Sequence, residues 1–184
     1  MKTTNLNRTL IILKPHAVLR GLTGRILARF EDMGLVISEL KLFRESAQFW
    51  AGFYPSDEQW LANVGSKTLD SCREIGINVE HELNTTDPLK IGRTVKGWLA
   101  DHMSSGPCIA AILEGNEAAR KVRKVCGATL PHAASPGTIR FDFSTDSPAL
   151  ANKEKRPVFN LIHATDPDEE GALEKELTYI FPSA

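Results

Sequence analysis

Runs of apolar and β-branched residues along the chain predict four strands. Three of the runs are nearly continuous, over residues 9–13, 107–113 and 158–162, as is typical of strands buried on both faces. The fourth strand, over residues 35–43, is predicted from charged residues that alternate with leucines, which is the period of an extended chain.

Apolar residues spaced three or four positions apart predict the helices between these strands. A helix after the first strand ends at Gly34 as its C-cap, and its buried face is formed by Leu22, Ile26, Phe30 and Met33. A second helix, over residues 116–126, is stopped by Gly127, and its buried face is formed by Ala119, Val122 and Cys126.

A third helix is predicted directly after the last strand. Asp166 is a good N-cap, Pro167 suits the first helical position, and the next three residues are acidic, which the helix dipole favours. Such a start would place free backbone N–H donors, a plausible phosphate site, beside His163. The alternative is that His163 is a strand-end histidine satisfied by an ordinary hydrogen bond.

Glu176 shares the buried stripe of this third helix with Leu173, Leu177 and Ile180. A carboxylate that faces a core is costly without a partner, and His163 is the nearest partner in sequence. A glutamate that accepts from one ring nitrogen fixes the tautomer and leaves the other nitrogen as the nucleophile. The alternative is a glutamate at the edge of the stripe that reaches water.

The order of the elements is β-α-β, a helical stretch and then β-α-β-α. This order predicts an α/β (α+β) fold, a ferredoxin-like split βαβ sandwich with a four-stranded antiparallel sheet and a helical insertion. The insertion, at about 55–94, carries a capping box at Ser56 and Gln59 and a helix start at Asp87. A second insertion, at 144–156, is polar and turn-rich, and we interpret it as a solvated loop.

Length, charge and cysteine content limit the classes of protein to which this chain can belong. A chain of 184 residues and 20.3 kDa is expected to form a single domain over residues 1–184. The net charge of −1, with acids and bases interspersed, argues against electrostatic capture by nucleic acid or an anionic membrane. The sequence shows neither a membrane-spanning apolar run nor a signal-peptide core, so we expect no membrane association. The three isolated cysteines indicate reduced thiols in the cytoplasm, and the histidines share no zinc-ligand spacing.

The segment from Asn160 to Asp166, NLIHATD, closely resembles the catalytic N-x-[IV]-H-[GA]-S-D segment of nucleoside diphosphate kinases. Further motifs of that family follow in the same order along the chain: RTLIILKP at 8–15 followed by Ala17-Val18, RGL at 20–22, SGP at 105–107, LEG at 113–115 and PGTIR at 136–140. The resemblance covers residues 8–54 and roughly 95–182, and it implies the same ferredoxin-like fold.

The resemblance implies a ping-pong kinase. A nucleoside triphosphate such as ATP gives its γ-phosphate to His163, and the phosphohistidine passes it to a second nucleoside diphosphate. In this scheme Glu176 orients the ring, and Lys14, Arg123 and Arg140 offset the charge of the phosphates. The chain has no G-x-x-x-x-G-K-[ST] loop, so side chains hold the phosphates together with Mg²⁺, which is bound mainly by the nucleotide.

Three further nucleotide contacts are implied by the resemblance. Thr129 aligns with a phosphate-contacting threonine, and Asn160 aligns with the residue that contacts the ribose 3′-hydroxyl. Tyr54 matches a tyrosine that hydrogen-bonds near the catalytic histidine. In a regular strand Asn160 and His163 would point to opposite faces, so both can serve one site only if the backbone departs from ideal pleating. The family usually assembles from dimers into tetramers or hexamers, which implies a homo-oligomer.

Some of these residues also have simpler interpretations. Lys14 could be an ordinary strand-end lysine, Arg123 could form a surface salt bridge, and Thr129 could be an unremarkable loop residue. Arg140 follows a Pro-Gly-Thr turn that can aim its guanidinium inward with bidentate geometry.

Four positions depart from the family pattern. His16 replaces an aspartate, Phe141 a glycine and Thr165 a serine, and Val95 falls where the family stacks an aromatic ring on the base. The candidates for a substitute platform are Trp98, Phe53 and the insertion. The departures leave open a second function, a catalytically weak nucleotide-binding or assembly subunit of the same fold. A phosphohistidine carrier fed by a protein is disfavoured, because the residues of a nucleotide site are present.

Overall fold

The computed structural model describes residues 6–74 and 76–182, which form two compact units. The sheet unit comprises residues 6–44, 106–145 and 160–182. The helical unit comprises the described residues of 45–105 together with 146–159. The chain therefore leaves the sheet unit twice and returns to it twice.

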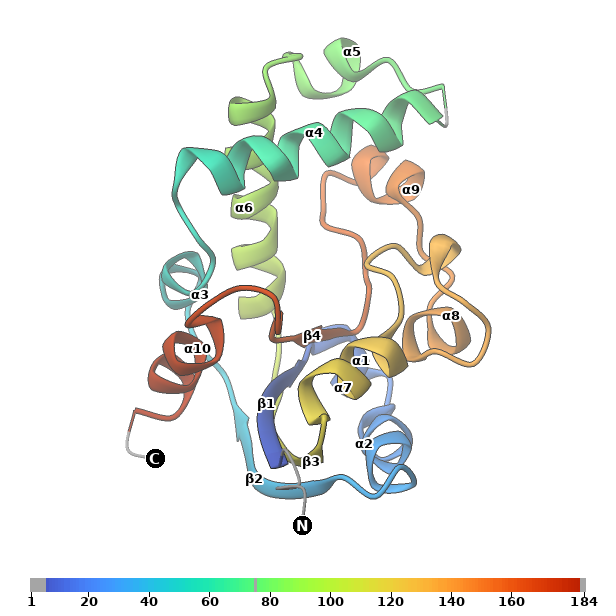
Figure 1. The fold of residues 1–184 in the computed structure, drawn as a ribbon. Coiled ribbons are helices and arrows are strands. Elements are labelled where there is room, and N and C mark those ends of the chain that lie inside the picture. The colour runs from blue at the N-terminus through green and yellow to red at the C-terminus, as the bar shows by residue number, and fades with distance from the viewer. Residues whose placement is uncertain (1–5, 75, 183–184) are drawn as a thin grey trace. The chain divides into compact units, whose positions relative to one another are not determined.

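A four-stranded sheet is the framework of the sheet unit (Figure 1). The strand order is β2-β3-β1-β4, and each neighbouring pair is antiparallel, which confirms the predicted sheet. The elements of this unit, in chain order, are β1 (Leu6–Leu13), α1 (Pro15–Leu19), α2 (Thr23–Glu31), β2 (Val36–Phe43), β3 (Cys108–Asn116), α7 (Ala118–Cys126), the 3₁₀ turn η1 (Pro131–Ala133), α8 (Ile139–Phe143), β4 (Ile162–Ala164) and α10 (Ala172–Ile180).

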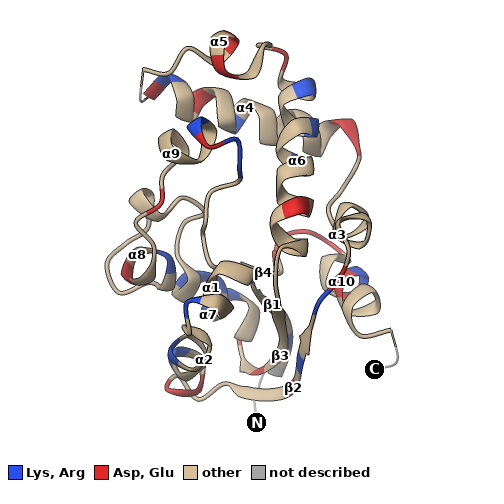
Figure 2. Cartoon of the chain, turned by 180° about the vertical axis from the view of Figure 1, so that it is seen from behind, with Lys and Arg blue, Asp and Glu red and all other residues tan. Residues whose placement is uncertain are grey.

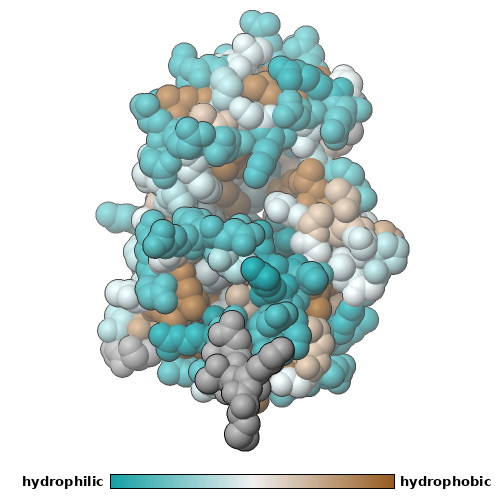
Figure 3. Space-filling view, viewed as in Figure 1, coloured by the Kyte–Doolittle hydropathy of each residue, from teal (hydrophilic) through white to brown (hydrophobic). Residues whose placement is uncertain are grey.

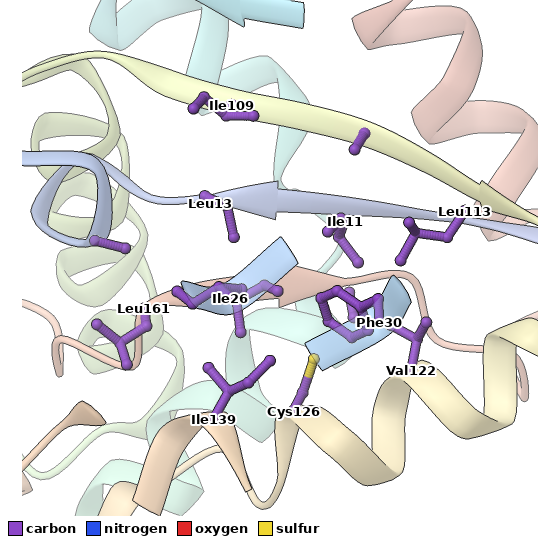
Figure 4. Packing of buried hydrophobic residues seen from close by; sticks show 14 of the residues in the cluster. Ile11, Leu13, Ile26, Phe30, Ile109, Leu113, Val122, Cys126, Ile139 and Leu161 are labelled. Carbon is purple, nitrogen blue, oxygen red and sulfur yellow. The ribbon is translucent and has the colours of Figure 1, made fainter. Parts of the chain in front are cut away.

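The core of the sheet unit joins the sheet to helices α2 and α7 (Figure 4). Ile11 and Leu13 lie two residues apart on β1 and therefore point to the same face. The same buried cluster includes Ile26 and Phe30 of α2 and Val122 of α7. Because each large side chain contributes about 1.5–3 kcal/mol when it is fully buried, strands and helices stabilise one another.

The helix predicted after the first strand is divided into α1 and α2. Gly21 lies between them with a φ of +68°, a conformation that glycine adopts without steric cost. The predicted apolar face is buried except for Met33, which is exposed because α2 ends two residues earlier, at Glu31.

Helix α7 begins two residues later than predicted. Strand β3 continues to Asn116, and Glu117 adopts a φ of +53° before the helix starts. The buried face therefore includes Ala118 and not Ala119. Gly127, with a φ of +83°, ends the helix as predicted.

The helical unit is built around two helices that meet at glycines. Its elements are α3 (Ala47–Phe53), α4 (Glu58–Glu74), α5 (Val79–Leu83), α6 (Pro88–Ser104) and α9 (Pro148–Lys153). A β-carbon at Gly65 of α4 would lie 1.8 Å from the carbonyl oxygen of Pro88, and one at Gly92 of α6 would lie 2.0 Å from that of Leu61. The two backbones thus approach where a side chain does not fit.

Aspartates cap both long helices of this unit. The predicted start of α6 is confirmed, since Asp87 Oδ1 accepts a hydrogen bond from the amide of Leu89 at 2.9 Å. The cap of α4 is Asp57 and not the predicted Ser56, because Asp57 Oδ1 accepts from the amide of Trp60 at 2.8 Å.

The second predicted insertion, 144–156, is not a solvated loop. It contains α9, where the Asn152 side-chain amide donates to Sγ of Cys72 at 3.0 Å. The guanidinium of Arg156 binds both carboxylate oxygens of Asp146, at 2.6 and 3.0 Å, and the two side chains are only 17% and 8% exposed. The polar composition that indicated a loop instead supplies a two-point ion pair inside the helical unit.

Charges of both signs are spread over the surface. Figure 2 shows basic and acidic residues on helices of both units, as the interspersed charges of the sequence predict. On the face seen in Figure 3, hydrophilic residues surround smaller groups of hydrophobic ones. Of the helices described, none has the length and apolar character needed to cross a bilayer.

Candidate active site

A sharp turn precedes strand β4. The predicted strand over 158–162 is replaced by a shorter one, Ile162–Ala164, because Leu161 adopts a φ of +71°. The amide of Ile162 donates to the carbonyl of Asn160 at 2.8 Å, which closes a γ-turn around Leu161. The backbone therefore departs from regular pleating between Asn160 and His163, as a shared site requires.

His163, in the middle of β4, contacts helix α10 through Glu176. Its Nε2 lies 2.9 Å from Glu176 Oε1, and the hydroxyl of Thr165 donates to Oε2 of the same carboxylate at 2.5 Å. The side chains of His163 and Glu176 are 24% and 15% exposed, so the pair lies at the margin of the interior. The predicted partner of His163 is confirmed as its contact.

Glu176 is held as a carboxylate. Burial on its own would raise its pKa, but the hydrogen bond and charge of His163, together with the Thr165 hydroxyl, outweigh burial and lower the pKa below 4.5. An ionised Glu176 accepts a hydrogen bond from Nε2–H of the ring. The proton therefore stays on Nε2, and the free lone pair is on Nδ1. Thr165 keeps the hydroxyl that the family's serine would supply.

Lys14, at the end of β1, is buried and binds Asn160. Its Nζ donates to Asn160 Oδ1 at 2.7 Å, and Nδ2 of Asn160 donates to the carbonyl of Thr129 at 3.1 Å. Burial, aided by the nearby charge of Arg140, lowers the pKa of Lys14 from 10.5 to about 7. An anion that reaches this amine would restore its charge, which distinguishes Lys14 from an ordinary strand-end lysine.

Arg140, on α8, points inward as predicted and is only 6% exposed. Its Nε, Nη1 and Nη2 donate to the carbonyls of Asn160 at 3.3 Å, Gly127 at 2.7 Å and Ile162 at 2.8 Å. The planar fork of guanidinium donors fits such a set of acceptors. Phe141 is 45% exposed, so its bulk does not fill the interior beside Arg140.

Arg123, on α7, forms the surface salt bridge that the sequence left as an alternative. Its Nη2 lies 3.1 Å from Oδ2 of Asp166, and its Nη1 donates to the carbonyl of Ala164 at 3.3 Å. The two charged side chains are 39% and 44% exposed. Because an exposed pair contributes only about 0–1 kcal/mol, a phosphate can replace Asp166 at little cost.

The third predicted helix, α10, begins five residues later than expected, at Ala172. Asp166 does not cap it, because Asp166 Oδ1 accepts from the amide of Asp168 at 3.1 Å and the other carboxylate oxygen binds Arg123. The predicted helix start at Asp166 is therefore wrong, and the amides directly after His163 are not those of a helix N-terminus.

Seven of the eight predicted site residues lie in the sheet unit. Each of the seven either belongs to the segment 160–166 or contacts it through its side chain or backbone. They are Lys14, Arg123, Thr129, Arg140, Asn160, His163 and Glu176. The eighth, Tyr54, belongs to the helical unit, where its ring stacks on that of Trp60 with centroids 6.3 Å apart. The role of Tyr54 stays a prediction.

Two residues hold this segment in ways that the sequence did not indicate. Nε2 of His16 accepts a hydrogen bond from the amide of Leu161 at 3.0 Å, and Asp166 engages Arg123. His16 directly follows the motif at 8–15 and Asp166 ends the motif at 160–166, so position within or beside a family motif was the signal by which they could have been found. Their partners are 145 and 43 positions away in the chain, and pattern along the sequence does not show such contacts.

Sequence comparison with known proteins identifies the family. A family model described as nucleoside diphosphate kinase matches residues 7–61 and 92–184. A nucleoside diphosphate kinase of Pyrobaculum aerophilum is 48% identical over 174 residues, which are 95% of this chain and 94% of that protein. One from Desulfatibacillum aliphaticivorans is 34% identical over 176 residues, 96% of this chain and 95% of that protein.

Solved structures agree with the sequences. The crystal structure of an NDP kinase from Pyrobaculum aerophilum has a TM-score of 0.90 at 45% identity and covers 96% of each chain. The Borrelia burgdorferi nucleoside diphosphate kinase, solved as a transition-state mimic with vanadate and ADP, has a TM-score of 0.68 at 30% identity and covers 96% of this chain and 87% of that one. These matches confirm the predicted fold class and the assignment as a phosphotransferase. The chain belongs to the nucleoside diphosphate kinase family.

Proposed function

We propose that this chain transfers the γ-phosphoryl group of ATP or another nucleoside triphosphate to a nucleoside diphosphate, by a ping-pong mechanism through phosphohistidine at His163. The observation that carries the proposal is the pair of His163 and Glu176, 2.9 Å apart, within the segment that resembles the family's catalytic motif. A module that only binds nucleotides has no use for a carboxylate that fixes the tautomer of a histidine.

Each half-reaction exchanges one bond for another at phosphorus. In the first, Nδ1 of His163 attacks the γ-phosphorus, and the bond to the bridging oxygen breaks so that the diphosphate leaves with the electron pair. In the second, a β-phosphate oxygen of the acceptor attacks the same phosphorus, and the N–P electrons return to Nδ1. Nε2–H donates to Glu176 throughout, so the carboxylate stabilises the positive ring without taking its proton.

The cations around segment 160–166 would contact the phosphates. Lys14 gains charge as a phosphate approaches, and Arg123 exchanges Asp166 for the ligand. Three of the five N–H donors of Arg140 are hydrogen-bonded to backbone carbonyls. Its positive charge and the other two donors can interact with the ligand. Thr129 is proposed to contact a phosphate, and Asn160 is proposed to contact the ribose 3′-hydroxyl. Tyr54 is proposed from its place in the matched sequence alone.

Mg²⁺ would enter with the nucleotide. The side chains of the proposed phosphate site are cations, an amide and a hydroxyl, which make a poor Mg²⁺ cage, and the described residues hold no cluster of three or more His, Cys, Asp or Glu suited to a metal. This donor set fits an ion that would be held mainly by phosphate oxygens and would offset part of their negative charge.

The nucleotide partners are proposed from relatives that bind ADP or CDP in solved structures. Val95, which falls where the family stacks an aromatic ring, packs instead against the core of the helical unit formed by Leu69, Cys72, Val79 and Ile91. We therefore propose weak discrimination between bases, since a ping-pong site need recognise only what all nucleotides share.

A homo-oligomer assembled from dimers, as a tetramer or hexamer, is also proposed. Strand β2 lies at the edge of the sheet, and its Val36, Leu40 and Leu42 are 62%, 52% and 64% exposed. Apolar side chains on an unpaired edge favour association with a second copy. We further propose a cytoplasmic protein with one kinase-like domain, because the family match includes residues of both units and the three cysteines are buried thiols.

Incubation with γ-labelled ATP and Mg²⁺, followed by a chase with GDP, tests the proposed function. Phosphohistidine is stable in base and labile in acid, so such a label is expected on the protein and should pass quantitatively into GTP. Protein that binds ADP but takes up no label would contradict the kinase and favour the nucleotide-binding subunit.

Glu176→Gln is expected to slow phosphorylation of His163 by about 10²-fold. The amide can still accept a hydrogen bond from Nε2, but its lack of charge no longer stabilises the positive ring. Single-turnover labelling at saturating ATP measures the loss. Glu174→Gln, an exposed change two residues earlier on α10, is the matched control and should keep the parental rate.

Nucleotide binding at pH 8 is expected to take up a proton at Lys14. With a pKa of about 7 the amine of the unliganded protein is mostly neutral at that pH, and the phosphates favour its charged form.

The same pKa shift affects folding stability. In the unfolded chain Lys14 has its ordinary pKa of 10.5, so between about pH 7 and 10.5 the unfolded chain binds more protons than the folded one. Lys14 therefore makes the free energy of unfolding rise with pH in this range.

Calorimetry of ADP binding in buffers of different ionisation enthalpy measures this proton. Lys14→Met should remove the buffer dependence, whereas Lys124→Met, an exposed change on α7, should leave it intact. Equal heats in all buffers for the parental protein would show that Lys14 is already charged.

A further inference from the structure

The turn at Leu161 is strained, and the strain lies between two residues of the proposed site. A leucine with a φ of +71° is rare, and such a strained conformation persists only where the surrounding structure imposes it. Glycine would remove the strain, but the Leu161 side chain is fully buried and packs in the core with Ile26 and Ile139 (Figure 4). The chain therefore needs both the side chain and the unusual backbone at this position.

Lys14 and His16 hold both backbone groups of Leu161. The amide of Lys14 donates to the carbonyl of Leu161 at 2.9 Å, and the amide of Leu161 donates to Nε2 of His16 at 3.0 Å. Because β4 begins only at Ile162, the Leu161 amide has no place in the strand ladder, and a side chain supplies its acceptor. Without His16 this buried amide would lose its acceptor, which is unfavourable for a group removed from water.

The bend after β1 brings these contacts to one place. The carbonyl of Lys14 accepts from the amides of Ala17 and Val18, which starts helix α1 and places His16 in its first turn. The same bend thus supplies the amine of Lys14, which binds the side chain of Asn160, and the imidazole of His16, which accepts from the amide of Leu161.

We infer that His16 is a positioning residue for phosphoryl transfer: as acceptor of the Leu161 amide it holds the turn that sets Asn160 and His163 in one site. The inference rests on the proposed function of His163. It also explains the departure from the family's aspartate at this position, because a carboxylate and a neutral imidazole share the ability to accept this hydrogen bond. Phosphoryl transfer is sensitive to such placement, since an error of 1 Å can cost about 10²-fold in rate.

Three variants test the inference: His16→Asp, His16→Asn and His16→Leu. The first two retain an acceptor and should keep most of the parental rate of His163 labelling at saturating ATP, whereas His16→Leu should lose about 10²-fold. His132→Leu, at an exposed position of η1, is the matched control and should behave as the parent. Circular dichroism confirms that each variant is folded at the temperature of the assay.

Amide hydrogen exchange at Leu161 supplies a readout that does not depend on activity. Exchange should accelerate at least tenfold in His16→Leu and remain slow in His16→Asp. Unchanged exchange in His16→Leu would overturn the proposed contact, and faster exchange with a parental labelling rate would overturn the positioning role. A failure of the proposed function is distinguishable from both, since the parental protein would then take up no label while its Leu161 amide stays protected.

Discussion

His163→Ala is expected to lower the rate of phosphoryl transfer from ATP to GDP by about 10⁴-fold or more. Removal of a covalent nucleophile abolishes the two-step route, and only the binding contacts remain to assist direct transfer. The base-stable, acid-labile label should disappear altogether. The folded structure should change little, because the side chain is 24% exposed and its loss opens no deep cavity.

The control for this experiment is His132→Ala. His132 is exposed in the turn η1, so its loss should change neither label nor rate. ADP affinity measured on His163→Ala should stay near that of the parent, since the proposed phosphate and ribose contacts are made by other residues. Label that persists in His163→Ala would identify another nucleophile and sink the proposed mechanism.

Arg140→Met is expected to reduce both stability and activity, with the largest loss of stability among the substitutions considered. It leaves the carbonyls of Gly127, Asn160 and Ile162 without their guanidinium donor. The carbonyl of Asn160 keeps the amide of Ile162 as a donor, whereas those of Gly127 and Ile162 lose the guanidinium. A buried acceptor that loses its partner costs about 1–3 kcal/mol, so these two should lower the free energy of unfolding by at least about 2 kcal/mol. For a chain of this length that is a fall in Tm of roughly 4–8 °C.

Activity of Arg140→Met should fall by more than about 10²-fold, because the γ-turn loses two of its supports together with a cation of the phosphate site. Arg140→Lys separates the two effects: it keeps the charge, but a single ammonium cannot match the fork that spans three carbonyls. Thermal denaturation and single-turnover labelling measure the two losses. Arg120→Met, an exposed change on α7, is the control, and an equal Tm for it and Arg140→Met would contradict the structural role.

The sheet and its core could be predicted from the sequence because local pattern determines them. Buried residues such as Leu10 to Leu13 form an unbroken apolar run, and Ile26 and Phe30 lie one turn apart on a helix. The pairing of Glu176 with His163 could also be predicted, since a carboxylate on a buried stripe requires a partner nearby.

Contacts between distant segments could not be read from the sequence. Asp166 has the sequence signature of a helix cap, yet Arg123, 43 positions earlier, competes for its carboxylate and the helix starts at Ala172. The reversed φ of Leu161 has no local signal either. Leucine rarely adopts it, and the hydrogen bonds that hold the turn come from Lys14, from His16 of α1 and from Arg140 of α8.

The helical unit shows the same limit. The polar residues of 144–156 indicated a loop, and nothing nearby in sequence shows that Asn152 meets Cys72, 80 positions away. The glycines of α4 and α6 likewise gave no sign that each lies against the other helix, since the reason for glycine is the backbone of a distant segment.

The buried cysteines give the two units separate chemical reporters. Burial raises the pKa of Cys108 to about 12 and that of Cys126 to about 11 in the sheet unit, and it raises the pKa of Cys72 in the helical unit. The thiolate is the reactive form, so a thiol reagent modifies these residues only after the surrounding structure opens. The rate at which Cys72 is modified therefore reports how fast the helical unit opens. The rates for Cys108 and Cys126 report how fast the sheet unit, which carries His163, opens.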